Sequence, residues 1–287
     1  MPQLFKQMTV CGVGLIGGSL ALAARHHGLV GRIVGLGRSQ ENLDVALRRG
    51  IVDDATRDPI HAARGADLIV LAVPIVTMRE TLAAMLPHCA PDAVVTDVGS
   101  VKGWVVRELE PLLAHGMALV AAHPVAGKET TGAASADAAL FVDRRVIITP
   151  SAKSTPAAVE KIEKLWQATG AKVERMDPDL HDQVLARASH LPQAVSTVLA
   201  AALSGEQVGG LLAAEYGAGG LRDTTRLAAS SWEMWRDIFA TNREAIAAAL
   251  KVFGATFAEF QRMVEANDMA GLERLFNRGR ALNKRVG

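Results

Sequence analysis

Two segments carry side chains that could take part in proton transfer, and each follows an apolar run. His123 directly follows Leu119–Ala122 and precedes Pro124. In open α/β sheets ligands gather at the carboxyl ends of strands, so an imidazole fixed there is well placed to accept a proton. Ser100 follows Val94–Asp97 and adds a hydroxyl. A structural histidine and a serine that caps a helix are the alternative interpretations of these residues.

A second group of charged and aromatic side chains lies in the carboxyl-terminal part of the chain. His190 lies in Ser-His-Leu-Pro-Gln, and Trp235 lies in Met-Trp-Arg-Asp-Ile. Arg222 and Arg226 lie in Gly-Gly-Leu-Arg-Asp-Thr-Thr-Arg, with the i, i+4 spacing that is also typical of a solvated helix face paired with acidic neighbours. A tryptophan is more often a core residue. By themselves, these residue types do not specify a chemistry.

A glycine-rich segment follows the first apolar run, Met8–Val13, and opens a helical pattern. Its residues are Gly12, Val13, Gly14, Leu15, Ile16 and Gly17. In a Rossmann loop the first glycine allows a tight turn, the second lets the backbone approach a pyrophosphate, and the third lets the helix pack against the strand. The strand before the loop and the helix after it favour dinucleotide binding over a glycine-rich turn without a ligand.

The position that usually selects the nucleotide carries no carboxylate. An NAD site places Asp or Glu about 20 residues after the last glycine of the loop, and Gly37 occupies that position here, followed by Arg38 and Ser39. A guanidinium and a hydroxyl would bind a 2′-phosphate. We therefore expect NADP, with NAD as the alternative if Arg38 is only a solvated charge and Glu41 supplies the carboxylate.

The elements that must position these side chains alternate between short apolar runs and helical patterns up to Pro178. The runs are Met8–Val13, Ile33–Leu36, Leu68–Val73, Val94–Asp97, Leu119–Ala122, Val146–Thr149 and Lys172–Arg175. The helical patterns between them are Gly17–His27, Glu41–Arg49, Val76–Met85, Lys102–Ala114 and Pro156–Thr169. Continuously apolar runs are typical of parallel strands covered on both faces. Residues 1–178 are therefore predicted to form a dinucleotide-binding α/β domain with a doubly wound Rossmann-type sheet.

From Asp179 onward the pattern is helical, and we predict no strand. Helical spacing is found in Asp182–Leu203, Met234–Val252 and Phe257–Ala266. Many alanines would let these helices approach closely, and a helical domain of this size often completes its core against a second copy. Residues 179–287 are therefore predicted to form an all-α substrate and dimerisation domain of a homodimer.

Composition excludes several classes of function. The chain has 31 basic and 30 acidic side chains and a formal net charge of +1, which argues against general affinity for nucleic acid or acidic membranes. Cys11 and Cys89 form neither a metal motif nor a disulfide framework, and we expect no metal site. Neither a signal peptide nor a membrane-spanning segment is apparent, so we expect a cytoplasmic protein with a small-molecule substrate.

In their order along the chain, these motifs resemble those of a known family. Gly-Ser-Val-Lys, His-Pro-Val-Ala-Gly, Ser-His-Leu-Pro and the Arg-Asp-Thr-Thr-Arg and Met-Trp-Arg-Asp-Ile segments are similar to the motifs of prephenate and arogenate dehydrogenases. The resemblance runs from Gly12 to about Asn242. It implies a compact, monofunctional form without a chorismate mutase or ACT domain. It also implies NAD(P)-dependent oxidative decarboxylation of prephenate to 4-hydroxyphenylpyruvate, or of arogenate to tyrosine, in tyrosine biosynthesis.

The resemblance also implies a role for each candidate residue. His123 would accept the proton of the ring hydroxyl, and Ser100 would orient His123 and touch the nicotinamide. Arg226 resembles the guanidinium that binds a substrate carboxylate.

Three further residues would complete the substrate pocket. The resemblance implies that His190 lines this pocket and that Arg222 adds positive charge to it. Trp235 resembles a residue that reaches the pocket from the partner subunit.

Two alternatives remain open on the sequence alone. One is another NAD(P)-dependent dehydrogenase with a Rossmann domain and a helical domain, of the β-hydroxyacid dehydrogenase or imine reductase type. The hydroxyacid enzymes commonly use a lysine in the helical half, and the stretch from Asp182 to Arg243 contains none. The other alternative is a non-catalytic nucleotide-binding protein, which would not need His123, Ser100 and Arg226 together.

Overall fold

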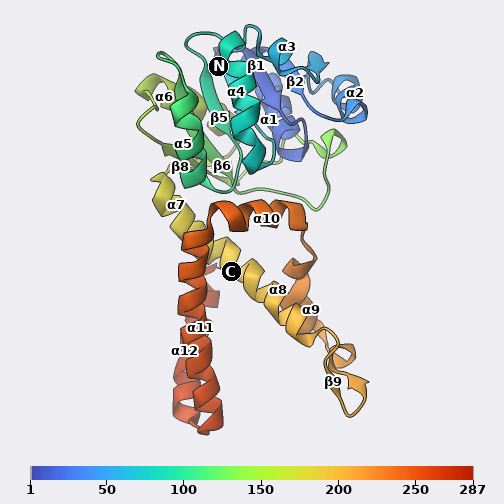
Figure 1. Cartoon of the computed structure of the whole chain (residues 1–287), viewed down its shortest axis with the longest axis vertical. Coiled ribbons are helices and arrows are strands. Elements are labelled where there is room, and N and C mark those ends of the chain that lie inside the picture. The colour runs from blue at the N-terminus through green and yellow to red at the C-terminus, as the bar shows by residue number, and fades with distance from the viewer. Residues whose placement is uncertain (1, 287) are drawn as a thin grey trace. The chain divides into compact units, whose positions relative to one another are not determined.

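The computed structural model describes residues 2–286, and the chain divides into two compact units. The first unit runs to Val184 and takes in Ser230–Asn242. The second unit consists of Leu185–Ala229 and the residues from Arg243 onward. In Figure 1 the colour follows the chain from the blue strands of the first unit to the red helices of the second.

An eight-stranded sheet forms the centre of the first unit, with its strands in the order β3-β2-β1-β4-β5-β6-β7-β8 (Figure 1). The strands are β1 (Phe5–Cys11), β2 (Val30–Leu36), β3 (Asp54–Thr56), β4 (Leu68–Leu71), β5 (Val94–Asp97), β6 (Ala118–Pro124), β7 (Arg145–Pro150) and β8 (Lys172–Arg175). The strand order reverses between β1 and β4, and this reversal defines a doubly wound nucleotide-binding sheet. The predicted Rossmann-type fold is confirmed.

Two details of the sheet differ from the prediction. β7 pairs antiparallel with β6, so the sheet is mostly but not wholly parallel. A parallel connection needs a crossover, usually a helix, whereas the segment between β6 and β7 contains only the short 3-10 turn Ala133–Ser135. β3 was also missed, because its three partly buried residues do not form an apolar run.

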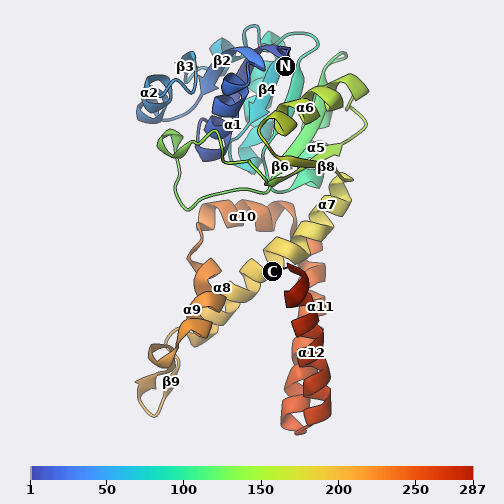
Figure 2. The ribbon, with the colours of Figure 1, turned by 180° about the vertical axis from the view of Figure 1, so that it is seen from behind.

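Helices cover both faces of the sheet. They are α1 (Leu15–His26), α2 (Gln40–Arg48), α3 (Pro59–Ala63), α4 (Met78–Met85), α5 (Lys102–Leu109) and α6 (Pro156–Ala168). α4 packs between α3 and α5, whereas α1 packs against α6 on the other face, as the views from the front and from behind show (Figures 1 and 2). The central strands β4, β5 and β6 are buried along their whole length, as the continuous apolar runs predicted, whereas the edge strands β3 and β8 are not. The sheet therefore offers its strand ends, rather than its faces, to a ligand.

Two further helices group with the sheet. α7 (Pro178–Leu185) follows β8, and α10 (Trp232–Thr241) contacts the 3-10 turn Ile75–Thr77 that follows β4. Because this turn leaves the carboxyl end of β4, α10 lies at the same edge of the sheet as the predicted ligand site. The domain boundary at residue 178 stays a prediction.

The second unit is mainly helical. It contains the π-helix η5 (Ala186–His190), α8 (Leu191–Leu203), α9 (Gly219–Thr225), α11 (Arg243–Glu265) and α12 (Met269–Val286). α11 packs against α12, and α8 packs against α9 (Figure 2). The predicted all-α character holds for its main elements. No helix within residues 2–286 combines the length and the apolar character needed to cross a bilayer.

The prediction that no strand follows Asp179 is wrong. β9 (Gln207–Val208) and β10 (Leu211–Leu212) form a small antiparallel hairpin. Gly209 and Gly210 connect the two strands, with φ of 60° and 82°. Positive φ at both residues of a two-residue turn matches the twist of a hairpin, and the Gly-Gly pair was the signal that could have predicted it.

The helix boundaries in this half also differ from the prediction. The segment expected as one helix over Asp182–Leu203 is three pieces, because the π-helix η5 separates α7 from α8. The helix expected over Met234–Val252 breaks at Asn242, where the side-chain amide Nδ2 donates to the carbonyl oxygen of Asp182 over 2.9 Å. α11 then continues to Glu265 and absorbs most of the helix expected over Phe257–Ala266.

Candidate nucleotide-binding and active site

The glycine loop between β1 and α1 has no room for side chains at two positions. Gly12 has φ of +95°, and a Cβ there would lie 2.4 Å from the carbonyl oxygen of Ala72, just after β4. A Cβ at Gly17 would lie 2.4 Å from the carbonyl oxygen of Gly12. Both distances are far inside van der Waals contact, so the close packing of α1 against the strand ends depends on these glycines.

The middle of the same loop is open. No atom lies within 4 Å of the place where a Cβ of Gly14 would stand. Gly14 is the N-cap of α1 and provides no side-chain cap, so the first-turn N–H groups, including those of Leu15 and Ile16, are available to an anion. This combination of open space and uncapped donors fits the pyrophosphate of a dinucleotide.

Arg38 and Ser39 lie at the start of α2, after β2. The hydroxyl of Ser39 accepts a hydrogen bond from the backbone N–H of Asn42 over 3.3 Å and so caps α2. A hydroxyl that accepts in this way keeps its own proton for another acceptor. Arg38 is exposed. The cap gives Ser39 a structural role in α2. The proton of its hydroxyl and the exposed side chain of Arg38 can still contact a nucleotide.

Asn42 connects the two parts of the predicted nucleotide-binding region, and it was not among the predicted site residues. Its amide Nδ2 donates to the carbonyl oxygen of Val13 over 2.8 Å, and its Oδ1 accepts from the backbone N–H of Ala133 over 2.8 Å. Asn42 thereby fixes the start of α2 against the glycine loop. An asparagine in the first turn of a helix is common, so the sequence offered no signal for this contact.

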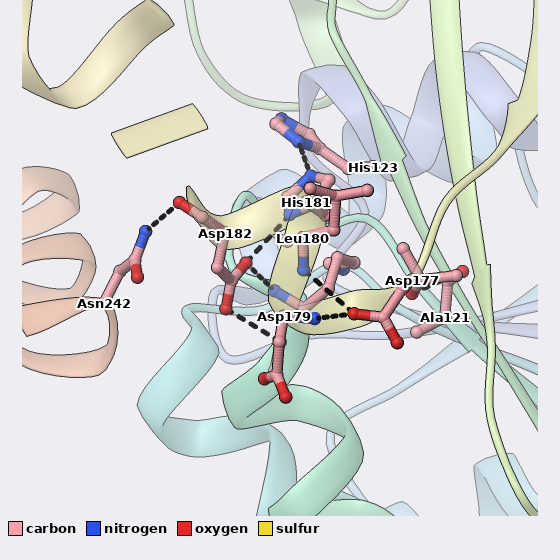
Figure 3. A network of polar contacts seen from close by, with 12 residues as sticks. Ala121, His123, Asp177, Asp179, Leu180, His181, Asp182 and Asn242 are labelled. Carbon is pink, nitrogen blue, oxygen red and sulfur yellow. Dashed lines mark hydrogen bonds and ion pairs between the residues drawn. The ribbon is translucent and has the colours of Figure 1, made fainter. Parts of the chain in front are cut away.

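His123 lies near the end of β6, where it is buried and contacts a second histidine (Figure 3). Its Nδ1 lies 2.8 Å from Nε2 of His181, and Nδ1 of His181 lies 2.8 Å from Oδ1 of Asp182. His181 and Asp182 both belong to α7. His181 was not predictable as a site residue, because it lies in no motif and only the fold brings α7 to the end of β6.

Asp182 also caps α5 from a distant part of the chain. Its Oδ1 accepts from the backbone N–H of Lys102 over 2.7 Å, and its Oδ2 accepts from that of Gly103 over 2.8 Å. The N-cap residue of α5 is Val101, which supplies no side-chain cap. The interpretation of Ser100 as a helix cap is therefore wrong. Ser100 is partly exposed between β5 and α5, and its proposed contact with His123 stays a prediction.

A buried ion pair holds the backbone next to His123. Nζ of Lys102 donates to Oδ2 of Asp97 and, over 2.8 Å, to the carbonyl oxygen of Ala122. Oδ1 of Asp97 accepts from the backbone N–H of Ala122 over 3.1 Å. Burial lowers the pKa of Lys102, and the negative charge of Asp97 opposes that shift. Because both side chains are fully buried, the pair ties the end of β5 and the start of α5 to the residue that precedes His123.

The remaining candidates come from helices outside the sheet. His190 is buried at the end of η5, and π-helical turns occur frequently at functional sites. Arg222 in α9 and Arg226 just after it are both exposed. Gln193 of α8 donates from Nε2 to the carbonyl oxygen of Leu227 over 2.8 Å. This bond ties the helix that follows His190 to the segment that carries Arg226.

Trp235 is half-buried on α10, with its ring 5.6 Å from that of Phe239. The structure thus places Trp235 in the first unit with His123 and Ser100, whereas His190, Arg222 and Arg226 belong to the second.

The described residues do not indicate metal or thiolate chemistry. Within residues 2–286, no group of three or more His, Cys, Asp or Glu side chains could hold a metal ion. Burial raises the pKa of the Cys89 thiol to about 11, and burial raises the pKa of Cys11 as well. Neither thiol is therefore a reactive thiolate near neutral pH.

Two family models match consecutive parts of the chain. The prephenate dehydrogenase nucleotide-binding domain matches residues 20–175, and the prephenate dehydrogenase dimerization domain matches residues 177–278. The cyclohexadienyl dehydrogenase of Zymomonas mobilis is 34% identical over 266 residues, which cover 92% of this chain and 90% of the relative.

Solved structures give the same result. A prephenate dehydrogenase of Aquifex aeolicus, in complex with hydroxyphenyl propionate and NAD+, has 31% identity and a TM-score of 0.92, with 98% of each chain covered. An arogenate dehydrogenase of Synechocystis has 29% identity and a TM-score of 0.86, with 98% of this chain and 100% of that chain covered. Together with the family matches, these similarities show that the chain belongs to the prephenate dehydrogenase family of NAD(P)-dependent oxidoreductases.

Proposed function

We propose that this enzyme oxidises the ring alcohol of prephenate or arogenate, with NADP as the preferred acceptor, and that the product loses CO2 to give an aromatic ring. The observation that carries the proposal is a buried imidazole, His123, at the carboxyl end of β6 in the same sheet as the glycine loop. Because the chain belongs to this family, we favour this reaction over that of a β-hydroxyacid dehydrogenase or an imine reductase. A non-catalytic nucleotide-binding protein would not need a buried histidine at this position.

The residues of the chain supply what this reaction requires. Oxidation of the ring alcohol gives a dienone, and loss of the carboxylate as CO2 then makes the ring aromatic, which drives the reaction forward. A bound nicotinamide nucleotide supplies the hydride acceptor. His123 accepts the hydroxyl proton, and Ser100 contacts the reacting groups from the neighbouring strand end. Neither a metal nor a covalent nucleophile is needed.

Two carboxylates of the substrate need cations. We assign the carboxylate contact to Arg226, whose guanidinium is exposed and can form a bidentate pair. Arg222, four residues earlier, adds positive charge, and His190 lines the pocket. Trp235 contributes from the partner subunit. These assignments rest on the motifs that the chain shares with the family and on the residue chemistry.

The preference for NADP rests on the segment after β2. Gly37 stands where an acidic side chain would bind the 2′-hydroxyl of NAD, and an exposed arginine and a serine hydroxyl follow it. A 2′-phosphate would find a charged partner in Arg38 and a donor in Ser39.

A homodimer through the helical unit completes the proposal. α11 and α12 expose many large apolar side chains, which are Leu250, Val252, Phe253, Phe257, Val264, Met269, Phe276 and Leu282. Exposed apolar patches of this kind mark interfaces, and the family model that matches this region describes a dimerization domain.

A steady-state comparison tests the function. The purified enzyme is mixed with prephenate or arogenate and with NADP or NAD, and the absorbance of the reduced cofactor is followed. We expect turnover with at least one substrate and a higher kcat/KM with NADP than with NAD. Absence of turnover with both substrates and both cofactors would contradict the proposed function, and a preference for NAD would contradict only the assignment of Arg38 and Ser39.

A further inference from the structure

We propose that His181 and Asp182 are positioning residues that fix the tautomer of His123, so that Nε2 of His123 carries the lone pair that accepts the substrate proton. The inference rests on the proposed function and extends it to two side chains in α7 that lie behind His123 (Figure 3). Hydrogen-bond contacts run from Asp182 to His181 and then to His123.

The carboxylate of Asp182 acts as a hydrogen-bond acceptor. Both of its oxygens accept backbone N–H groups, from Lys102 over 2.7 Å and from Gly103 over 2.8 Å. These groups form the amino-terminal turn of α5, where the helix dipole favours a negative charge. An ionised carboxylate can only accept hydrogen bonds. Nδ1 of His181, 2.8 Å from Oδ1 of Asp182, must therefore be the donor of that contact.

The number of protons on a neutral imidazole sets the direction of the next contact. A neutral ring carries one N–H, so a proton on Nδ1 of His181 leaves Nε2 of that ring as an acceptor. Nε2 lies 2.8 Å from Nδ1 of His123, which must then donate. The single proton of neutral His123 is thus on Nδ1, and the lone pair is on Nε2. This is the tautomer that a proton acceptor facing the substrate requires.

The three side chains in these contacts are buried, and the helix that carries two of them is held in place. His181 is fully buried, and Asp182 and His123 are nearly so. The start of α7 is capped by Asp177, whose Oδ1 accepts from the backbone N–H of Leu180 over 2.9 Å. The second turn of α7 is held by the bond from Asn242 to the carbonyl oxygen of Asp182. A buried network that is held on several sides keeps its hydrogen-bond directions, and the surrounding low dielectric strengthens each bond.

The same arrangement stabilises the product of proton transfer. When the O–H bond of the substrate breaks, its proton goes to Nε2 of His123, and the ring becomes an imidazolium. Nδ1–H continues to donate to His181, and the charge of Asp182 lies on the far side of that ring. A fixed negative charge in a buried site favours the positive ring that forms.

Two variants of His181 separate positioning from simple support of the fold. His181→Leu removes the acceptor, so we expect kcat to fall roughly 10- to 100-fold, below the roughly 10²–10⁴-fold contribution of a positioned base because His123 remains. KM should stay within about threefold, as the change acts on the proton transfer and not on binding. His181→Gln places an amide oxygen near the position of Nε2, and it should restore most of the kcat.

The tautomer can be observed without substrate. Protein labelled with ¹⁵N-histidine distinguishes a protonated from an unprotonated ring nitrogen by NMR, and the His123→Asn and His181→Gln spectra assign the signals. We expect His123 of the unsubstituted enzyme to carry its proton on Nδ1. His61→Gln is the matched control, because exposed His61 also contacts a carboxylate, Asp54, at 3.0 Å, and it should leave kcat, KM and the His123 signals unchanged.

The outcomes distinguish this inference from the proposed function. Turnover by the unsubstituted enzyme tests the function by itself. If that turnover is present but His123 carries its proton on Nε2, the positioning role is overturned and the proposed function stands. The same conclusion follows if kcat per folded enzyme is equal in His181→Leu, His181→Gln and the unsubstituted protein. If His181→Leu does not fold, the NMR spectrum of the unsubstituted protein still decides the tautomer.

Discussion

The glycine loop after β1 and the surroundings of His123 lie at strand ends of one sheet, but they are held in different ways. The loop owes its shape to missing side chains, since a Cβ at Gly12 or Gly17 would lie 2.4 Å from a carbonyl oxygen. His123 is held by buried charged groups, among them Asp97, Lys102 and Asp182. The fold should therefore tolerate no added side-chain atoms at Gly12 and Gly17, whereas the other region should tolerate no lost charge or hydrogen bond.

The largest effect is expected at the proton acceptor. His123→Asn keeps a polar side chain but removes the basic nitrogen, so kcat should fall by roughly 10²–10⁴-fold. The dissociation constant of NADP should remain nearly unchanged, because the glycine loop is built from other residues. Steady-state kinetics and a nucleotide titration of the same preparation measure the two quantities. A variant that keeps most of its turnover would remove His123 from the mechanism.

The next effect is expected at the buried ion pair. Lys102→Met leaves the carboxylate of Asp97 buried without its cation, which should lower the free energy of unfolding by about 3–5 kcal/mol. Chemical denaturation measures this loss. Lys164→Met is the control, because Lys164 forms an exposed ion pair with Glu160 at 2.6 Å, and such pairs contribute about 0–1 kcal/mol. Equal losses in the two variants would show that burial of the charges does not matter here.

A smaller effect on stability is expected in the glycine loop, and it should differ between Gly12 and Gly14. Gly12→Ala adds a Cβ against the backbone at a positive φ, so it should cost about 1–3 kcal/mol of unfolding free energy and also weaken nucleotide binding. Gly14→Ala adds its Cβ in open space, so its stability should stay within about 0.5 kcal/mol while nucleotide affinity falls. If both variants bind NADP normally, the loop is not the pyrophosphate site.

The smallest effect is expected at the exposed residue after β2. Arg38→Ala should raise the KM for NADP by about tenfold, since one charge-assisted contact at an exposed position is lost. The KM for NAD, which lacks the 2′-phosphate, should not change. Arg32→Ala is a suitable control, because Arg32 is also exposed and pairs with Asp54 at 2.8 Å. An equal change for both cofactors would contradict recognition of the 2′-phosphate by Arg38.

The contrast between the two regions also explains which parts could be predicted from the sequence. The loop is encoded by six consecutive residues, Gly12 to Gly17, so a local pattern was enough to predict its conformation, and its binding of the pyrophosphate stays a prediction. The side chain of His123 contacts His181 of α7, and the preceding residue, Ala122, is held by β5 and α5. These elements are distant in sequence, and His181 lies in no motif. Asp182 contacts both the start of α5 and His181, and these partners are distant from or unmarked in the sequence. The link from Asp182 through His181 to His123 needed the tertiary structure.

Local patterns also failed for short or interrupted elements. β3 has three residues and no apolar run, and the hairpin of β9 and β10 has two residues in each strand. The break at Asn242 arises because its side chain bonds the backbone of α7, and no pattern within α10 or α11 encodes that contact. α12 was not predicted either.

The central claim is that an imidazole at the sheet edge and a guanidinium from the helical unit act on one substrate. A crystal structure of the enzyme with NADP and an unreactive substrate analogue tests it most directly. We predict that Nε2 of His123 lies within about 3.2 Å of the ring oxygen and that the guanidinium of Arg226, from either subunit, lies within the same distance of a carboxylate oxygen. A bound analogue that neither residue contacts in any subunit would contradict the account.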